Sequence, residues 1–316
     1  MPVEPAIRKI LPPLSLAPSS LLARNLLEGI SKHYLWQSEC PIVTAETIPL
    51  HKSKDRSKDG RQILYISGIA LKLEKIWRQS PLEIATSLAS LIPLSPDFSV
   101  TVVPPGWIHL QLTDTGIANF LQGLAQNAYG QWGEASGAKF LPQNIDDTTN
   151  ASLLHSSKSE AKNSKLHSQN SAIKTQQSLP KGVFQIQYAN ARCCSLLRSA
   201  CQEGLIVPSQ LARNISWLDE RDQLRLTEPR EFVLISRLMA TLDALARRPD
   251  RGKILKLAAA LADDFQKFYS ACRIWGEVKQ ENLDLACGRL GLVLGTQKLL
   301  RFLLEEGLGL VAPEEL

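Results

Sequence analysis

The sequence lacks several features that would assign it to a common functional class. No run of about 18 apolar residues occurs in its 316 positions, so we expect no transmembrane helix and no membrane partner. Its six cysteines form no C-x-x-C pair, and most of them stand in apolar, helix-like surroundings. We therefore interpret them as buried, reduced thiols of a cytoplasmic protein, in preference to a metal site or disulfides.

Motifs for common cofactors and metals are missing as well. The chain contains no GxxxxGK[ST] phosphate loop, no GxGxxG dinucleotide loop and no HExxH zinc motif. The adjacent pair Cys193 and Cys194 has no lysine or histidine close by in the sequence, which favours core packing over a reactive thiol. We therefore predict no catalytic residue, no bound metal and no cofactor.

Composition divides the chain into three regions. A formal net charge of +5 is compatible with a nucleic-acid partner without requiring one. Residues 18–130 mix helix and strand patterns, residues 143–182 are dominated by polar residues, and residues 183–316 are strongly helical. The middle region cannot bury enough apolar surface to offset the entropy of ordering, so a disordered linker is predicted there. About 38 flexible residues span roughly 35 Å, which would let the flanking regions act as separate modules.

The first region is predicted to be an α+β domain. A helix capped by Ser19 or Ser20 is expected to run to about residue 35, and helices are expected at 69–78 and from Pro81 onward. Alternation of apolar and polar residues predicts strands at 98–103 and 107–112, followed by a helix at 115–128.

The third region is predicted to be an all-α helical bundle. Its apolar residues recur with the 3.6-residue period of a helix, and no strand pattern is present. The expected helices lie at about 184–203, 209–215, 228–248, 251–275 and 282–307.

Several segments together resemble one enzyme family. Residues 187–192 read QYANAR, and they are followed along the chain by LADDFQKFYSACRIW and by a C-terminal GLGLVAPEEL. These segments resemble the DALR-type anticodon-binding domain of arginyl-tRNA synthetases. In the first region, YISGIALKLEKIWRQSPLEIA and VVPPGWIHLQL are similar to the additional N-terminal domain of the same family. The resemblance implies an arginine-type tRNA as partner.

Three positions depart from the family pattern. Gly68 and His109 stand where the family usually carries asparagines, and Leu316 replaces a terminal methionine. In the family, the asparagine at the position of Gly68 contributes to contact with the tRNA D-loop, so the resemblance leaves D-loop recognition in question.

The sequence between the two family-like regions is too short for a synthetase catalytic domain. Only 54 residues separate Ala128 from Val183, whereas a doubly wound nucleotide-binding domain contains several βαβ units of about 30 residues each. None of the five histidines stands in a HIGH-type motif. The KMSK-like segment at 51–60 precedes the first family-like motif, and we interpret it as a solvated basic loop. Arginine–tRNA ligase activity is therefore not expected of this chain alone.

Candidate RNA-binding residues come from the helical region. RNA loops are read by stacking of bases on aromatic or arginine planes, with cations on the backbone. The candidates for tRNA contact, some of them implied by the resemblance, are Gln187, Tyr188, Asn190, Arg192, Tyr269, Arg273 and Leu316. A basic helix junction supplies weaker candidates for phosphate contact, namely Arg247, Arg248, Arg251 and Lys253. Structural roles compete at each position, since the tyrosines can pack in the core and the arginines can brace helices or remain solvated.

Three functions remain open on the sequence alone. The first is a non-catalytic synthetase-like protein that binds tRNA. The second is a protein-interaction module with a protein partner. The third is one part of a split arginine–tRNA ligase whose catalytic chain acts in trans.

Overall fold

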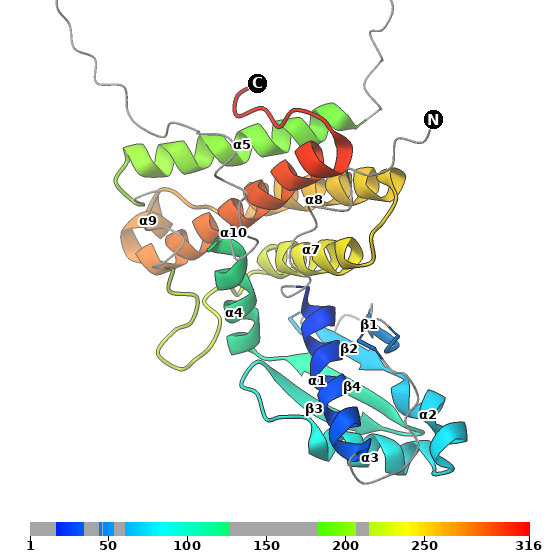
Figure 1. Ribbon diagram of the computed structural model, residues 1–316. Coiled ribbons are helices and arrows are strands. Elements are labelled where there is room, and N and C mark those ends of the chain that lie inside the picture. The colour runs from blue at the N-terminus through cyan, green and yellow to red at the C-terminus, as the bar shows by residue number, and fades with distance from the viewer. Residues whose placement is uncertain (1–16, 35–43, 46, 54–60, 127–181, 207–214) are drawn as a thin grey trace, which may run out of the picture.

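The computed structural model describes residues 17–34, 44–45, 47–53, 61–126, 182–206 and 215–316. The predicted linker at 143–182 lies outside these residues, apart from Gly182, as does most of the helix expected at 209–215. Two regions are seen in Figure 1, a sheet with helices at one end and a group of long helices at the other.

The first region is an α+β domain, as predicted. Its sheet has four antiparallel strands in the order β1-β2-β4-β3, and α1 and α3 pack together beside it. Its elements are α1 (Pro18–Tyr34), β1 (Leu50–Lys52), β2 (Leu64–Ser67), α2 (Ile69–Trp77), α3 (Pro81–Leu91), β3 (Phe98–Val103), β4 (Trp107–Leu112) and α4 (Asp114–Ala125). The bounds predicted for β3 and β4 are confirmed, whereas β1 and β2 were not predicted. Helix α1 begins at Pro18, so neither Ser19 nor Ser20 stands before it as a cap.

Local sequence signals explain where two of these helices begin. Ser80 and Glu83 form a reciprocal capping box in front of α3, with Pro81 in its first turn. Thr113 accepts a hydrogen bond from the Gly116 N–H at the start of α4. A Cβ on Gly116 would lie 2.0 Å from the carbonyl oxygen of Asp97, so this close approach to the β3 side requires glycine.

The second region is an all-α bundle, as predicted. It consists of α5 (Val183–Gln202), α7 (Pro229–Ala246), α8 (Arg251–Ala271), α9 (Glu277–Glu281), α10 (Leu283–Phe302) and a π-helical turn, η3 (Leu303–Gly307). The helix expected to reach residue 275 ends at Ala271, because the chain becomes extended at Cys272. Glu228 and Glu231 form a capping box at the start of α7, whose proline was the signal used to place it.

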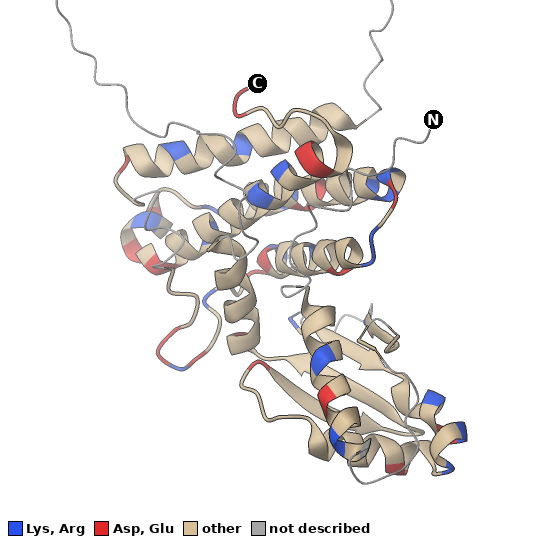
Figure 2. Ribbon diagram, viewed as in Figure 1, with Lys and Arg blue, Asp and Glu red and all other residues tan. Residues whose placement is uncertain are grey.

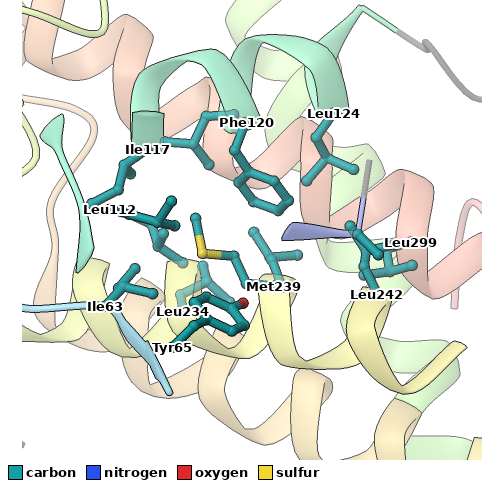
Figure 3. Packing of buried hydrophobic residues seen from close by; sticks show 14 of the residues in the cluster. Ile63, Tyr65, Leu112, Ile117, Phe120, Leu124, Leu234, Met239, Leu242 and Leu299 are labelled. Carbon is teal, nitrogen blue, oxygen red and sulfur yellow. The ribbon is translucent and has the colours of Figure 1, made fainter. Parts of the chain in front are cut away.

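The two regions share one hydrophobic core. Side chains from β2, β4 and α4 meet side chains from α7 and α10 in a single buried cluster. Figure 3 shows Met239 at its centre, with Tyr65, Leu112 and Phe120 around it. The linker length was expected to let the two regions act as separate modules, whereas in the structure their apolar faces pack together. The apolar faces that pack together are more than 100 positions apart in the sequence. Local periodicity cannot predict such a contact.

Polar contacts reinforce the docking between the regions. Asp243 of α7 accepts hydrogen bonds from the Tyr65 hydroxyl at 2.7 Å and from the Ser19 backbone N–H at 2.9 Å. Further contacts between the regions are Lys52 Nζ to Ser236 O (3.0 Å), Arg61 to Thr227 O (2.9 Å), Trp217 Nε1 to Gln122 Oε1 (2.8 Å), the Leu224 N–H to Asp114 Oδ2 (2.9 Å) and Lys298 Nζ to Ala125 O. The hydrogen-bond partner of the buried Tyr65 hydroxyl belongs to the other region. These polar contacts would therefore be broken if the two regions separated.

Lys52 makes the stability of this docked structure dependent on pH. Burial at the interface lowers the pKa of Lys52 from 10.5 to about 8, although Asp243 partly opposes this shift. Between these two pH values the folded chain binds fewer protons at Lys52 than the unfolded chain, so this group makes stability rise with pH. We expect wild type to gain roughly 2–3 kcal/mol relative to Lys52→Met between pH 7.5 and pH 10 in urea unfolding. Comparison with the variant cancels titrations elsewhere in the chain.

The control for this measurement is Lys72→Met, which removes a lysine from an exposed position on α2. The free energy of unfolding of this variant should differ from that of wild type by the same amount over the whole pH range. If the difference in free energy of unfolding between wild type and Lys52→Met were also independent of pH, burial of the Lys52 ammonium group between the two regions would be contradicted.

Candidate nucleic-acid interface

The QYANAR segment lies inside helix α5 and not in a turn before it. Phe184, Tyr188 and Arg192 follow one another at intervals of four residues, so they share one face of the helix. The Phe184 side chain is 67% exposed and the Tyr188 side chain 46% exposed. Their rings are stacked with centroids 6.5 Å apart. We call Phe184, Tyr188 and Arg192, together with Tyr269, the aromatic strip.

Arg192 connects the aromatic strip to helix α8. Its guanidinium donates a hydrogen bond to the Tyr269 hydroxyl and lies over the Tyr269 ring, 4.8 Å from the centroid. The Tyr269 ring is in turn stacked on the buried Phe265 at 6.4 Å. Arg192 and Tyr269, both half-buried, are thus fixed in place while part of each still faces solvent.

Gln187 and Asn190 hold the C-terminal tail, which we define as residues 308–316. The side-chain amide of Gln187 donates to the carbonyl oxygen of Val311 at 2.9 Å, and that of Asn190 donates to the carbonyl oxygen of Pro313 at 2.8 Å. Asn190 is fully buried, and its Oδ1 has no hydrogen-bond partner among the described residues. Both residues were predicted as candidates for tRNA contact, and in the structure their NH₂ groups position the tail.

The remaining candidates from the predicted set, Arg273 and Leu316, are both exposed. Arg273 is exposed and follows the end of α8, and its carbonyl oxygen accepts a hydrogen bond from Arg289. Leu316 is 65% exposed at the end of the tail. The structure thus brings Tyr188, Arg192, Tyr269 and the tail together around α5.

The basic helix junction is largely engaged within the protein. Arg247 donates to the carbonyl oxygen of Leu50 at 3.3 Å, across the contact with the first region. Arg251 donates to the carbonyl oxygen of Leu308 at 2.6 Å, and Lys253 pairs with Asp250 at 3.5 Å. Arg248 is exposed and adopts a left-handed backbone conformation with φ of 51°. These positions therefore stay weaker candidates than the aromatic strip.

Three residues of this surface were missed by sequence reasoning. Phe184 stands one helical turn before Tyr188, and this spacing was the signal that could have found it. Arg198 and Arg301 contact the tail through Glu314 and Glu315, which no local pattern indicates. The sequence of α5 from Val183 to Gln202 contains Arg192 and Arg198 and no acidic residue, in line with the blue on this helix in Figure 2.

Of the two positions in the first region that depart from the family pattern, Gly68 lies against β4 and His109 lies within it. A Cβ on Gly68 would lie 2.8 Å from the Trp107 ring, so this ring occupies the space of a larger side chain at position 68. His109 is half-buried on β4, paired across the sheet with Ile66 and Thr101.

The cysteines of the described part of the chain are free thiols. Burial raises the pKa of Cys193 well above its ordinary value of 9.0 and raises that of Cys194 to about 11. Such thiols are poor nucleophiles. Within the described ranges no group of three or more His, Cys, Asp or Glu side chains is placed to hold a metal ion. No helix in that part of the chain is long and apolar enough to cross a membrane.

Comparison with known proteins finds a domain family that the helical region resembles. Residues 186–316 match the DALR anticodon binding domain. The chain is 37% identical to an arginine–tRNA ligase of Synechococcus sp. (strain JA-3-3Ab) over 147 residues, which are 46% of this chain and 24% of the relative. It is also 37% identical to the arginine–tRNA ligase of Gloeobacter violaceus over 125 residues, 37% of this chain and 20% of the relative.

A similar likeness extends to the arginine–tRNA ligase of Frankia alni, at 34% identity over 148 residues, 45% of this chain and 24% of the relative. The chain therefore spans about a quarter or less of the length of these curated relatives. No solved structure matches the chain. The helical region, with its QYANAR helix, its Tyr269 helix and its tail, is thus similar over residues 186–316 to the DALR anticodon binding domain.

Proposed function

We propose that this chain is a non-catalytic, synthetase-like protein that binds tRNA through the aromatic strip of its DALR domain. The observation that carries the proposal is the exposed, stacked pair of Phe184 and Tyr188 beside the fixed Arg192–Tyr269 pair. The curated relatives are named arginine–tRNA ligases, which makes an arginine-type tRNA the first ligand to test.

The chemistry of the strip suits a single-stranded RNA loop. Unpaired bases stack on exposed aromatic rings, and each such stack contributes about 1–3 kcal/mol. Arg192 adds a cation one helical turn beyond Tyr188 on the same face, and Tyr269 already orients it. The Gln187 and Asn190 contacts fix the tail beside the rings, so the tail forms one wall of the proposed binding surface.

Absence of catalysis is part of the proposal. The 54 residues between Ala128 and Val183 are too few for a doubly wound nucleotide-binding domain, which supports a role without aminoacylation. Arginine-dependent ATP–pyrophosphate exchange by the purified chain would contradict this part. The free, buried thiols support a reducing, cytoplasmic location.

Direct binding tests the proposal. Purified chain is titrated into labelled arginine-type tRNA and into an unrelated RNA of equal length, at one stated salt concentration. We expect saturable binding with preference for the tRNA. An affinity weaker than about 100 µM, equivalent to about −5.5 kcal/mol, would sink the proposal.

The Tyr188→Ala variant tests the aromatic strip itself. Removal of one exposed ring should weaken tRNA binding by roughly 5- to 100-fold, the equivalent of one lost base stack. Because Tyr188 is 46% exposed, the fold should be retained. The matched control is Leu283→Ala, which removes a 52% exposed apolar side chain at the start of α10. Equal affinity of both variants and wild type would remove Tyr188 from the interface.

A protein-interaction role and a split ligase are the alternatives. The Trp107 ring occupies the space that a side chain at position 68 would need. This favours the loss of at least one RNA contact in the first region, which would leave that surface available to a protein partner. Capture of partners from nuclease-treated lysate separates the cases, since protein partners persist after RNase treatment. A catalytic chain acting in trans would restore arginylation when added to this chain.

A further inference from the structure

The tail lies along one stripe of helix α5, next to the aromatic strip. Its contacts with α5 follow the helix in order, from Gln187 with Val311 to Asn190 with Pro313 and then to Arg198 with Glu314 and Glu315. At about 100° per residue, Arg198 lies about 80° round the helix from Tyr188 and about 15 Å farther along its axis. Arg198 therefore stands at the border between the tail and the aromatic strip.

Two arginines hold the acidic end of the tail. Arg198 donates to the carbonyl oxygen of Glu314 at 3.4 Å and pairs with the Glu315 carboxylate at 3.1 Å. Arg301 of α10 lies 3.8 Å from the Glu314 carboxylate and also pairs with Glu305 at 3.2 Å. Figure 2 shows the acidic end of the tail in red above α5 and α10.

The root of the tail and its acidic end are held in different ways. Leu308 and Ala312 are buried, and the Leu310 N–H donates to the carbonyl oxygen of Leu304 at 2.8 Å. By contrast, the Glu315 side chain is 80% exposed and that of Glu314 is 41% exposed. Exposed ion pairs are weak, so the acidic end can leave while the root stays in place.

We propose that Arg198 and Arg301 form a phosphate-binding pair for RNA, which Glu314 and Glu315 occupy until RNA displaces them. The inference rests on the proposed function, and it adds a way in which the acidic end of the tail regulates RNA binding at the same surface. Carboxylate and phosphate oxygens are both partners for guanidinium groups, and a phosphate can take the place of a carboxylate at the same donors. RNA whose bases stack on Phe184 and Tyr188 would bring its backbone toward Arg198.

The first test compares two pairs of substitutions that change the net charge equally. Glu314→Gln with Glu315→Gln removes the tail carboxylates from Arg198 and Arg301, whereas Glu277→Gln with Glu281→Gln removes two exposed carboxylates from α9. We expect the tail pair to bind tRNA about three- to tenfold more tightly than wild type, and the α9 pair to change affinity by less than about twofold. Equal changes in both pairs, or weaker binding by the tail pair, would overturn the inference.

Arg198→Gln provides the second arm. It should weaken tRNA binding, and combined with Glu315→Gln it should abolish the gain that Glu315→Gln gives alone. If wild type binds tRNA and none of these variants differs from it, the inference fails while the proposed function stands. If neither wild type nor the tail pair binds any RNA, the proposed function itself fails.

Backbone order parameters from NMR give a readout that does not depend on affinity. On addition of saturating tRNA, the order parameters of the Glu314 and Glu315 amides should fall, while that of Leu310, whose N–H donates to the carbonyl oxygen of Leu304, stays high. A rise at Glu314 and Glu315 would mean that the acidic end joins the RNA complex, which contradicts displacement.

Discussion

Replacement of Arg289 by methionine is expected to lower the free energy of unfolding by about 3–5 kcal/mol. Arg289 Nε lies 2.6 Å from the Glu231 carboxylate, and the two side chains are 6% and 0% exposed. Glu231 also closes the capping box of α7 through the Glu228 N–H at 2.8 Å. Without Arg289, the carboxylate would remain buried with no opposite charge beside it, which is the costly outcome for such a pair.

Urea unfolding at pH 7 measures this loss. Burial already raises the pKa of Glu231, and removal of Arg289 should raise it further. The deficit of Arg289→Met should therefore shrink as pH falls and the carboxyl becomes neutral in the folded state. The double variant Glu231→Leu with Arg289→Met should be more stable than Arg289→Met alone. A loss below about 1 kcal/mol in the single variant would show that the pair is not buried as described.

Replacement of Met239 by aspartate is expected to separate the two regions. Met239 is fully buried at the centre of the shared core, so a carboxylate there would be buried without a partner (Figure 3). An unpaired buried charge costs several kcal/mol, and undocking returns it to water. Small-angle scattering should therefore show a larger radius of gyration, while circular dichroism retains its helical signal.

Met239→Leu is the matched control, because it keeps volume and apolar character and should remain docked. Wild-type scattering and unchanged thermal stability in Met239→Asp would contradict a core shared by the two regions.

Local patterns in the sequence were sufficient for much of the fold. The alternation in WIHLQL placed β4 at its observed bounds, and Pro229 marked the start of α7. Strand β2 was not predicted because an apolar run such as ILYI is equally typical of a buried strand and of a buried helix. Strand β1 was not predicted because it has only three residues. The docking of the two regions was not predicted either, because residues in contact across it, such as Tyr65 and Asp243, are 178 positions apart.

Local patterns also placed some of the candidate residues on their helices, but not their long-range contacts. The four-residue spacing of Tyr188 and Arg192 was sufficient to place them on one helix face. The partner of Arg192 is 77 positions away, and those of Gln187 and Asn190 are more than 120 positions away. Such contacts depend on how α5 packs on α8 and on where the tail returns, which helix periodicity alone does not determine.

Chemical footprinting of arginine-type tRNA bound to the purified chain tests the central claim most directly. If the aromatic strip and the root of the tail form the binding surface, nucleotides of the anticodon loop should be protected by wild type, and the protection should weaken with Tyr188→Ala. Leu283→Ala should leave the pattern unchanged. Absence of protection in the anticodon loop, or protection that is insensitive to Tyr188, would contradict the account.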